Sequence, residues 1–515
     1  MDRFARQALE EYNSDTKTVR RAGFGGVPFW NINSSQFTFV PQFEFSEIPG
    51  ARAYLYTARD KDGREHTFEA DTPIAPLTPI WAEIPVGFVT LTVEAIHIRG
   101  ERYLAGARTF FKSAPFPGRE DLPPRARSYR ECARLAFAFL FRDPATQHWL
   151  THGVPDPTYY INVYPSKTIS SIVRAMLAYA KMEPAVAADA IRLARNAADY
   201  LLLITYPDGS PLEGLPPTYS FLGLDREIVN KNCVAAEGRE HTLMMIYPAF
   251  VGSMYLGLEE ATGDARYFEA ARRIAEYYAA HVLENGSWYL LLDAATGEPQ
   301  NHNCCQHFSI LNFLTAYAER TGEERFREMA TRYFDYIASR CLDSYNWEGQ
   351  FEDVKLTTNY HNLTHLTADS MISYIAKNHR NDPEKLAMAE QMMRYVEDQF
   401  VVWGEYAPWN RSLSPGGTFH SPAALEQYEW YVPIDGSTGA VMRAMLDLYE
   451  VTGNELLREK ACALADAITR MQGESGVIPT HWMSKDPAKD LYNFWINCHI
   501  GTAFNMLHIA ELFGE

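Results

Sequence analysis

The 515-residue sequence predicts a mainly α-helical protein in which six helical hairpins close into an (α/α)6 toroid, preceded by a small antiparallel β-sandwich. Three observations support this fold class. Residues 33–115 alternate apolar and polar side chains, the chain from residue 128 onward has helical periodicity, and a recurring junction joins the helices. A chain of this length exceeds one ordinary hydrophobic core, so more than one structural unit is expected.

The N-terminal part divides into three segments. Residues 1–32 form a leader with a short helix and a glycine-rich stretch, residues 33–115 form the β-sandwich, and residues 116–127 form a proline-rich linker. Segments such as QFTFVPQFEF and GFVTLTVEAIHI have the period of two that is typical of half-buried strands, and turn residues separate them. This pattern predicts an antiparallel sandwich.

A repeated junction joins the helices of residues 128–515 in pairs. The strong copies are Thr262-Gly263-Asp264, Thr321-Gly322-Glu323 and Thr452-Gly453-Asn454. The glycine suits the left-handed C-cap of the first helix and the polar residue suits the N-cap of the second, so each junction predicts a tight αα-hairpin. Thr262 and Thr321 are 59 residues apart, and a weaker copy at residues 378–384 fills the longer interval to Thr452. A period of this size is typical of a tandem array.

The first helix of each pair is apolar nearly all round, whereas the second carries charge on one face. Helices of the first kind are buried, and those of the second kind lie outside. We therefore expect six inner helices, which start near residues 165, 241, 304, 361, 433 and 494. An open α-solenoid is the alternative, but it requires polar-faced capping repeats that the sequence lacks.

The segment that precedes each inner helix is rich in Trp, Tyr, His and Asn. We name these the first to sixth mouth segments; they are residues 157–168, 230–242, 301–307, 345–365, 409–438 and 480–499. In a toroid all inner helices begin at the same end, so the six segments are expected to surround one cavity. Helix N-termini favour an anionic group at that end.

The fourth mouth segment contains the densest group of acidic residues, in the run WEGQFEDV. Glu348, Glu352 and Asp353 lie within six residues, and neighbouring carboxyls in a pocket acquire the separated pKa values that general acid and base catalysis needs. The alternative is a polar hairpin whose carboxylates cap a helix or pair with a lysine. We expect these three residues to be catalytic.

Histidines and an arginine complete the expected chemistry. His361 and His365 are four residues apart, as in some metal sites, but the run HNLTH has no carboxylate between them, so we expect no metal and no other cofactor. We expect His361 to be catalytic. In the second mouth segment Glu237, Arg239 and His241 bring together an acid, a guanidinium and an imidazole, although this group could equally cap a helix. We expect Glu237 and His241 to be catalytic.

The other aromatic and polar residues of the mouth segments are expected to bind substrate. They are Tyr160, Arg239, Asn303, Asn359, His365, Trp409, Arg411, Tyr428, Trp430, Tyr492, Trp495, Asn497 and His499. In this interpretation the indole rings stack on sugar rings and an arginine binds a sugar carboxylate.

Composition disfavours several classes of partner. The net charge of −18 argues against an extended nucleic-acid surface, which requires clustered Lys and Arg. No apolar run is long enough to cross a membrane, and the seven cysteines have neither zinc spacing nor a disulfide framework. No apolar signal-peptide region is visible at the N-terminus, so we expect a cytoplasmic protein, with a trimmed periplasmic or secreted one as the alternative. The expected partner is an oligosaccharide, and homo-oligomerisation is left open.

Residues 126–515 resemble the (α/α)6-toroid enzymes of polysaccharide breakdown, on junctions such as ATGDARYFEAARRIAEYY and on the aromatic, His-rich mouth segments. These enzymes include unsaturated glucuronyl hydrolases, β-glucuronidases of the same barrel type, uronate-cleaving polysaccharide lyases and sugar 2-epimerases. Residues 33–115 resemble a fibronectin type III-like domain, on Pro41, Pro49-Gly50-Ala51, Trp81 and Pro85. The junctions identify the architecture, and no catalytic motif of one family matches residue by residue.

The resemblance and the acidic residues favour a glycoside hydrolase that is exo-acting on uronic-acid-containing, glucuronide-type oligosaccharides. Two of the acidic residues would form the catalytic pair, and Arg239 or Arg411 would bind the sugar carboxylate.

Three other hypotheses remain open. In a polysaccharide lyase, one of His241, His361, Tyr428 and Tyr492 would remove the proton beside a uronate carboxylate. A sugar epimerase would use paired histidines, for example His361 with His499. A non-catalytic helical scaffold or glycan-binding protein is the fourth hypothesis, and the carboxylates of the fourth mouth segment argue against it.

Overall fold

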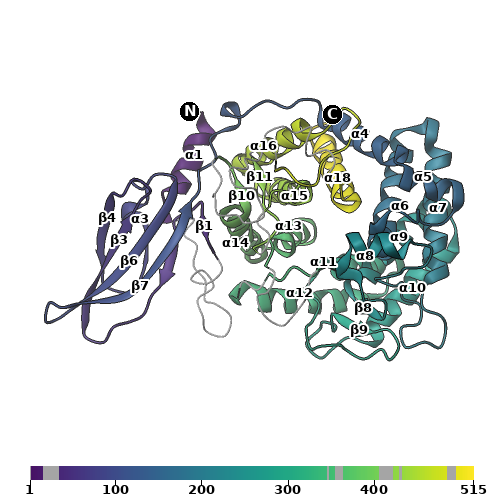
Figure 1. Ribbon diagram of the computed structural model, residues 1–515, viewed down its shortest axis with the longest axis horizontal. Coiled ribbons are helices and arrows are strands. Elements are labelled where there is room, and N and C mark those ends of the chain that lie inside the picture. Colours follow the sequence, from purple (N-terminus) through teal and green to yellow (C-terminus); the bar gives the residue numbers. More distant parts are fainter. Residues whose placement is uncertain are drawn as a thin grey trace.

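The computed structural model describes residues 2–15, 34–344, 347–353, 363–404, 422–428, 432–483 and 494–515, without the side chains of residues 343 and 344. Figure 1 shows the strands beside a group of helices, with α1 (Arg3–Tyr12) between them. The hydroxyl of Tyr12 donates to the carbonyl of Ser113 at 2.8 Å, and its ring packs on Trp81. The protein is mainly helical, as the sequence predicts.

The N-terminal strands form one large sheet and one short ladder. The strands are β1 (Gln36–Phe37), β2 (Gln42–Glu44), β3 (Ala51–Arg59), β4 (Glu65–Ala70), β5 (Ile74–Pro76), β6 (Gly87–His97) and β7 (Arg102–Lys112). The sheet has the order β1-β7-β6-β3-β4, and β2 pairs with β5. The pairs β3–β4, β3–β6 and β6–β7 are antiparallel, with Tyr56 opposite Val93 in β3–β6.

The second layer of this domain is smaller than a sandwich would have. It consists of the β2–β5 ladder and the one-turn helix α3 (Thr78–Trp81), with Phe43 packed against Phe37 and Phe110 of the large sheet. Strand β1 also runs parallel to β7, unlike the all-antiparallel arrangement that the sequence predicts. Trp81 lies in α3, whose N-cap residue Leu77 directly follows β5. Its buried ring stacks on Phe110. The described strands therefore do not establish an antiparallel sandwich.

The remaining helices form two concentric layers. The inner helices are α6 (Pro165–Met182), α9 (Ile246–Thr262), α11 (Phe308–Thr321), α13 (Leu366–Asn378), α15 (Asp435–Thr452) and α18 (Ile496–Leu512). The outer helices are α4 (Tyr129–Arg142), α7 (Ala187–Ile204), α10 (Ala265–Ala280), α12 (Glu324–Ser344), α14 (Pro383–Phe400) and α16 (Glu455–Met471). Each inner helix packs on the next, and α18 packs on α6 and on α4, so the described helices close into a ring of six hairpins.

Shorter elements connect these layers. They are α5 (Pro144–His152), α8 (Arg226–Asn232), β8 (Thr242–Met244), β9 (Leu291–Asp293), β10 (Val401–Val402), β11 (Ala423–Ala424) and the 3-10 turns η3 (Arg119–Asp121), η4 (Tyr160–Val163), η5 (Pro184–Val186) and η6 (Val234–Ala236). Strand β8 pairs with β9, and β10 pairs with β11.

The hairpin junctions have the conformations that the sequence predicts. Gly263, Gly322 and Gly453 have φ of 70°, 74° and 68°, the left-handed conformation in which a side chain would be strained. The side chain of Asp264 then accepts a hydrogen bond from the amide of Arg266 and caps α10. The glycine and the cap residue of each junction thus favour these turns locally.

The inner helices begin a few residues later than expected in the second, third and fourth hairpins. Helix α9 starts at Ile246 and not near residue 241, because residues 242–244 pair with β9 as strand β8. Helix α11 starts at Phe308, where the imidazole of His307 accepts from the amide of Ser309 and caps the helix.

The sheet domain is fixed to the outer face of the ring through α14. The carboxylate of Asp398 accepts from the amides of Thr38 and Phe39 at 2.9 and 2.7 Å. The side-chain amides of Gln36 and Gln399 each donate to the other residue's carbonyl, at 3.1 and 2.9 Å. Burial raises the pKa of Asp398 to about 7. These buried contacts attach the sheet domain to the ring at a defined position.

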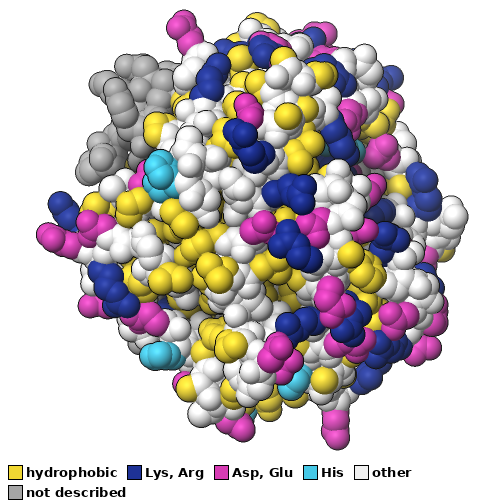
Figure 2. All heavy atoms as spheres, turned by 90° about the vertical axis from the view of Figure 1, so that its right-hand side faces the viewer, with side chains coloured by type: hydrophobic (Ala, Val, Ile, Leu, Met, Phe, Trp, Pro, Cys, Tyr) yellow, Lys and Arg dark blue, Asp and Glu magenta, His cyan; other side chains and the backbone are white. Residues whose placement is uncertain are grey.

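The surface carries charges of both signs. Figure 2 shows basic and acidic side chains interspersed on one face, around a group of hydrophobic side chains. Within the described part of the chain, no helix is both long and apolar enough to cross a lipid bilayer. The seven cysteines all lie in described residues and are free thiols.

Candidate active site

Two adjoining cavities lie where the inner helices begin. The larger cavity has a volume of about 340 Å³ and the smaller of about 180 Å³, and both are lined by Lys167 and Asn497. Residues of the larger cavity include Ser171, Arg174, Tyr247, His307, Gln350 and Asn505, and those of the smaller include Tyr160, Tyr164, Cys233, Glu352, Asp353 and Trp495. Together the cavities have the size of a small-molecule site.

Glu352 is held from three sides. One carboxylate oxygen forms an ion pair with Lys167, and the other accepts from the hydroxyl of Tyr247. The backbone carbonyl of Glu352 accepts from the hydroxyl of Tyr219 at 2.7 Å and from the guanidinium of Arg239 at 2.6 Å. The side chain is almost fully buried. Because both carboxylate oxygens are engaged, Glu352 is suited to fix the shape of the site.

Asp353 follows Glu352 and faces the smaller cavity. Solvent reaches its side chain, although the surrounding ring encloses it. This enclosure raises the pKa of Asp353, and the charge of Glu352 raises it further, whereas Lys167 and Arg239 favour the ionised form. Asp353 is thus a carboxylate that a ligand can touch.

Glu426 is a titratable residue near this site that the sequence analysis did not single out, and it lies near the carboxylates of the smaller cavity without lining either cavity. Burial raises its pKa to about 8, the charges of Asp353 and Glu352 add to the effect, and Lys167 opposes it. One of its carboxyl oxygens, Oε2, has no hydrogen-bond partner among the described residues. Glu426 is therefore protonated at neutral pH, beside the carboxylates of the fourth mouth segment.

Distant parts of the chain place Glu426 there. It follows the β10–β11 ladder, and its backbone amide donates to the carbonyl of Val432 at 2.9 Å. Its own carbonyl accepts from the hydroxyl of Thr364. In the sequence it stands in the fifth mouth segment, in the run AALEQ, and the sequence analysis assigned it no role.

Glu348 lies behind the wall of the larger cavity. It is 2% exposed, accepts from the side-chain amide of Asn303 at 2.9 Å and contacts the amide of Gln350. Burial raises its pKa to about 7. Gln350 itself lines the larger cavity, whereas Glu348 and Asn303 line neither cavity. The placement of Glu348 and Asn303 supports a role in positioning Gln350, unlike the expected catalytic and sugar-binding roles.

The second mouth segment lines the smaller cavity with Asn232, Cys233, Val234 and Ala235, and its Arg239 holds Glu352 from behind. Arg239 reaches Glu352 and the hydroxyl of Tyr219. Glu237 and His241 are exposed and line neither cavity, because residues 242–244 leave the ring as strand β8. This placement gives no support to the catalytic role expected for Glu237 and His241.

Two of the expected binding histidines lie in the core. His365 is fully buried and pairs with Asp369 at 2.6 Å. His499 is also fully buried, and its two ring nitrogens bond the carbonyl of Ala136 and the amide of Ile478. Burial lowers the pKa of His499 to about 4, so it is neutral. Neither imidazole can reach a ligand in the cavities from these positions.

Tyr428 also lies away from the cavities, at the contact between the ring and the sheet domain. Its hydroxyl donates to the side-chain carbonyl of Gln399 at 2.8 Å, and its ring packs on Phe400. Tyr160, Trp495 and Asn497 do line the smaller cavity. The other expected residues lie outside the described residues; they are Asn359, His361, Trp409, Arg411, Trp430 and Tyr492.

His307 is the one histidine of the described residues that lines either cavity. It caps α11, its ring packs on Phe250, and burial lowers its pKa to about 4. The sequence analysis noted it in the third mouth segment without assigning it a role.

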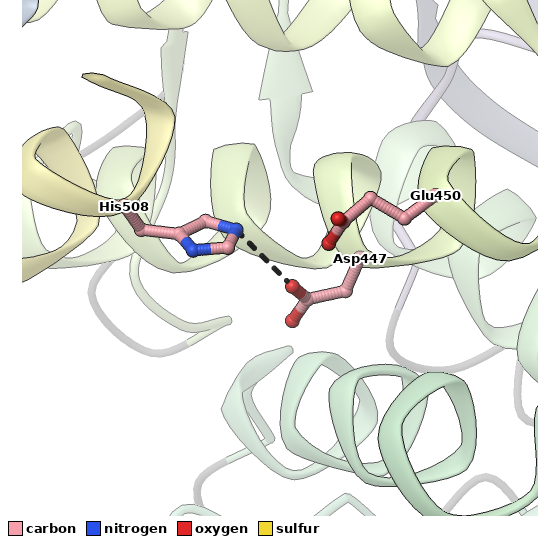
Figure 3. Close-up of side chains that lie close together, drawn as sticks. All are labelled: Asp447, Glu450 and His508. Carbon is pink, nitrogen blue, oxygen red and sulfur yellow. Dashed lines mark ion pairs between the residues drawn. The ribbon is translucent and has the colours of Figure 1, made fainter. Parts of the chain in front are cut away.

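A second group of titratable residues lies at the opposite end of the ring. Asp447, Glu450 and His508 come within 4.8 Å of one another and could hold a metal ion (Figure 3). However, Asp447 already accepts from the guanidinium of Arg443 at 2.7 Å and lies 3.5 Å from His508. This group is accounted for as an ion-pair network.

No protein-family model matches this sequence, and no curated protein matches it. Solved structures with a similar fold include cellobiose 2-epimerase from Spirochaeta thermophila, with 12% identity, a TM-score of 0.51 and coverage of 75% of this chain and 98% of that chain. D-mannose isomerase has 10% identity, a TM-score of 0.51 and coverage of 75% and 97%. An unsaturated glucuronyl hydrolase specific for heparin has 11% identity, a TM-score of 0.45 and coverage of 75% and 98%.

The likenesses to cellobiose 2-epimerase and D-mannose isomerase show that the described helices have the (α/α)6-toroid fold. At such identities the reaction and the substrate have to be argued from the site itself.

Proposed function

We propose that this protein is a glycoside hydrolase in which Glu426 is the general acid and Asp353 is the base or nucleophile. The observation that carries the proposal is a protonated carboxyl, Glu426, close to a solvent-exposed carboxylate, Asp353, that lines the smaller cavity. Glycosidases in general use such a pair, because one carboxyl protonates the leaving oxygen while the other attacks or activates water.

The surrounding residues support these two roles. Lys167 and Arg239 favour the ionised form of Asp353, while burial and the neighbouring negative charges keep the proton on Glu426. Trp495 and Tyr160 provide aromatic surface in the smaller cavity, on which the apolar face of a sugar can pack. Glu352 holds the fourth mouth segment in place through its contacts with Lys167 and Tyr247.

A sugar epimerase is the second candidate, because His307 is neutral and lines the larger cavity. His499, which the epimerase hypothesis pairs with His361, lies in the core with both nitrogens bonded. For a lyase, Tyr428 and His241 lie away from the cavities. The described residues therefore supply a carboxyl pair more readily than a pair of bases.

The test is a screen on methyl and 4-nitrophenyl glycosides, including glucuronides and galacturonides, followed by NMR spectroscopy. A hydrolase releases the free sugar; Asp353→Asn strongly reduces the release from both kinds of glycoside, and Glu426→Gln reduces it from methyl glycosides. Conversion of a reducing disaccharide to its C2 epimer, lost in His307→Asn and retained in Glu426→Gln, would establish the epimerase instead. An unsaturated product absorbing near the enoate band would establish a lyase.

The finer assignments of the N-terminal part remain proposals. Residues 33–115 are proposed to be a fibronectin type III-like unit, supported by an aromatic core of Phe37, Phe43 and Phe110. The proposed linker is residues 116–127, and the proposed catalytic domain is residues 128–515. Expression of residues 1–115 alone tests the boundary: a cooperative thermal transition supports it, and an unfolded product contradicts it.

A further inference from the structure

Arg174 projects from α6 into the larger cavity. It follows Lys167 and Ser171 at the spacing of one helix face, and all three line that cavity. With a rise of about 1.5 Å per residue, Arg174 lies about 10 Å deeper along α6 than Lys167. Arg174 also lines three other cavities further along the inner helices. It therefore lies where the cavities of the two ends of the ring adjoin.

The guanidinium of Arg174 lacks a counter-ion among the described residues. Its contact is the ring of Phe504, 5.2 Å from the guanidinium carbon. The surrounding ring lowers the pKa of Arg174, and no carboxylate of the described residues offsets this effect. The side chain is nevertheless exposed to solvent in the cavity, so its guanidinium is accessible to a bound anion.

Several other cations and acids near these cavities are paired. Lys167 is bound to Glu352, and Arg443 to Asp447 at 2.7 Å. Asp369 is a buried acid that lines an adjoining cavity, and its carboxylate is paired with His365. Arg239, expected from the sequence to bind a sugar carboxylate, donates to Glu352 and Tyr219. Arg174 is thus the guanidinium that these contacts leave open to a ligand.

We infer that Arg174 binds the carboxylate of a uronic acid whose anomeric carbon lies beside Asp353 and Glu426. This inference rests on the proposed function and adds the substrate class to it. The roughly 10 Å along α6 between Lys167 and Arg174 leaves room for one pyranose ring. Ser171, Asn497 and Gln350 line the same cavity and offer neutral hydrogen-bonding groups for sugar hydroxyls. A planar guanidinium can bind the carboxylate through two parallel hydrogen bonds.

The test is a calorimetric comparison of methyl β-glucuronide with methyl β-glucoside on the full-length protein. We expect the glucuronide to bind at least about tenfold more tightly, since a hydrogen bond to a charged group is worth about that much. Arg174→Gln should remove the preference, and Arg174→Lys should keep part of it. Thermal melts report whether each variant folds.

The matched control is Lys181→Gln. Lys181 lies one further heptad along α6 and lines the cavity at the far end of the helix. The Lys181→Gln substitution should leave the preference for the glucuronide unchanged. Loss of the preference in Lys181→Gln as well would place the anion at the far end and overturn the inference. Equal binding of both sugars, or an Arg174→Gln variant that still prefers the glucuronide, would also overturn it.

Two further results separate this inference from the proposed function. Hydrolysis of neutral glycosides that depends on Glu426, with no preference for uronides, would overturn the inference and keep the hydrolase. Arg174-dependent binding of glucuronide without turnover of any glycoside would support the binding site and reject the hydrolase. Inorganic phosphate is the probe for a free-anion site, and phosphate binding without glucuronide binding would overturn the inference.

Discussion

The two ends of the helical ring contain similar residues in different states of pairing. At the end where the inner helices begin, burial raises the pKa of Glu426 to about 8, and Asp353 faces a cavity. At the opposite end, Asp447 is bound by Arg443 and lies near His508 (Figure 3). Both ends contain acids and arginine, so composition alone does not tell them apart.

The difference shows what makes an acidic cluster reactive. A carboxylate that is bound to an arginine stays ionised and is held in one place, which suits structure. A carboxyl that is buried beside other negative charges keeps its proton at neutral pH and can donate it. We therefore place the chemistry at the end that holds Glu426 and Asp353, and the following variants test this difference.

The largest effect is expected for Asp353→Asn. Loss of the attacking or water-activating carboxylate should reduce kcat/KM on a cleaved glycoside by about 10³-fold or more. Asp447→Asn, the same change at the opposite end, should leave kcat/KM within about twofold. Comparable losses in both variants would mean that the two ends do not differ as described.

Glu426→Gln should reduce kcat/KM by about 10²-fold on a methyl glycoside, because an alkoxide leaving group needs a proton from the acid. A 4-nitrophenyl glycoside should be affected far less, since 4-nitrophenolate leaves without protonation. Steady-state rates on the two substrates measure this contrast. An equal loss on both would show that Glu426 acts through the structure of the site and not as an acid.

The pH dependence follows from the protonation state of Glu426. Its pKa is raised to about 8, so the active, protonated form is complete below that pH and is lost above it. A profile of kcat/KM on a methyl glycoside should fall about tenfold per pH unit beyond pH 8. Glu426→Gln should lose this basic limb. A wild-type profile that already falls above pH 5 would contradict the raised pKa.

The smallest effect is on stability. Lys167→Met leaves the buried carboxylate of Glu352 without its cation, which should lower the free energy of unfolding by about 3 kcal/mol. Arg443→Met, whose side chain is 39% exposed, should cost about 1 kcal/mol or less. Urea denaturation at pH 7 measures both. Equal losses would show that the two ion pairs are buried to the same degree in solution.

Local sequence signals predicted the hairpins, and non-local packing decided much of the site. Gly263 and Asp264 cap their helices through contacts within a few residues, so their pattern could be recognised. Residues 242–244 became a strand because they pair with β9, which lies almost fifty residues away. That pairing moved His241 away from the cavity.

Buried polar residues were the hardest to interpret from the sequence. His499 stands in a polar mouth segment, yet both of its nitrogens bond backbone groups of distant elements. Glu426 stands in the fifth mouth segment, but its raised pKa depends on carboxylates of the fourth mouth segment and on Lys167. Neither environment can be predicted from the neighbouring residues in the sequence, because each depends on how the ring closes.

Infrared difference spectroscopy of the carboxyl C=O band tests the central claim most directly. Spectra of the wild type and Glu426→Gln, recorded between pH 4 and pH 10, isolate the protonated form of Glu426. The account predicts a band that is present at pH 7, disappears with a midpoint near pH 8 and is absent from the variant. A midpoint near the ordinary glutamate value of about 4.3 would contradict it.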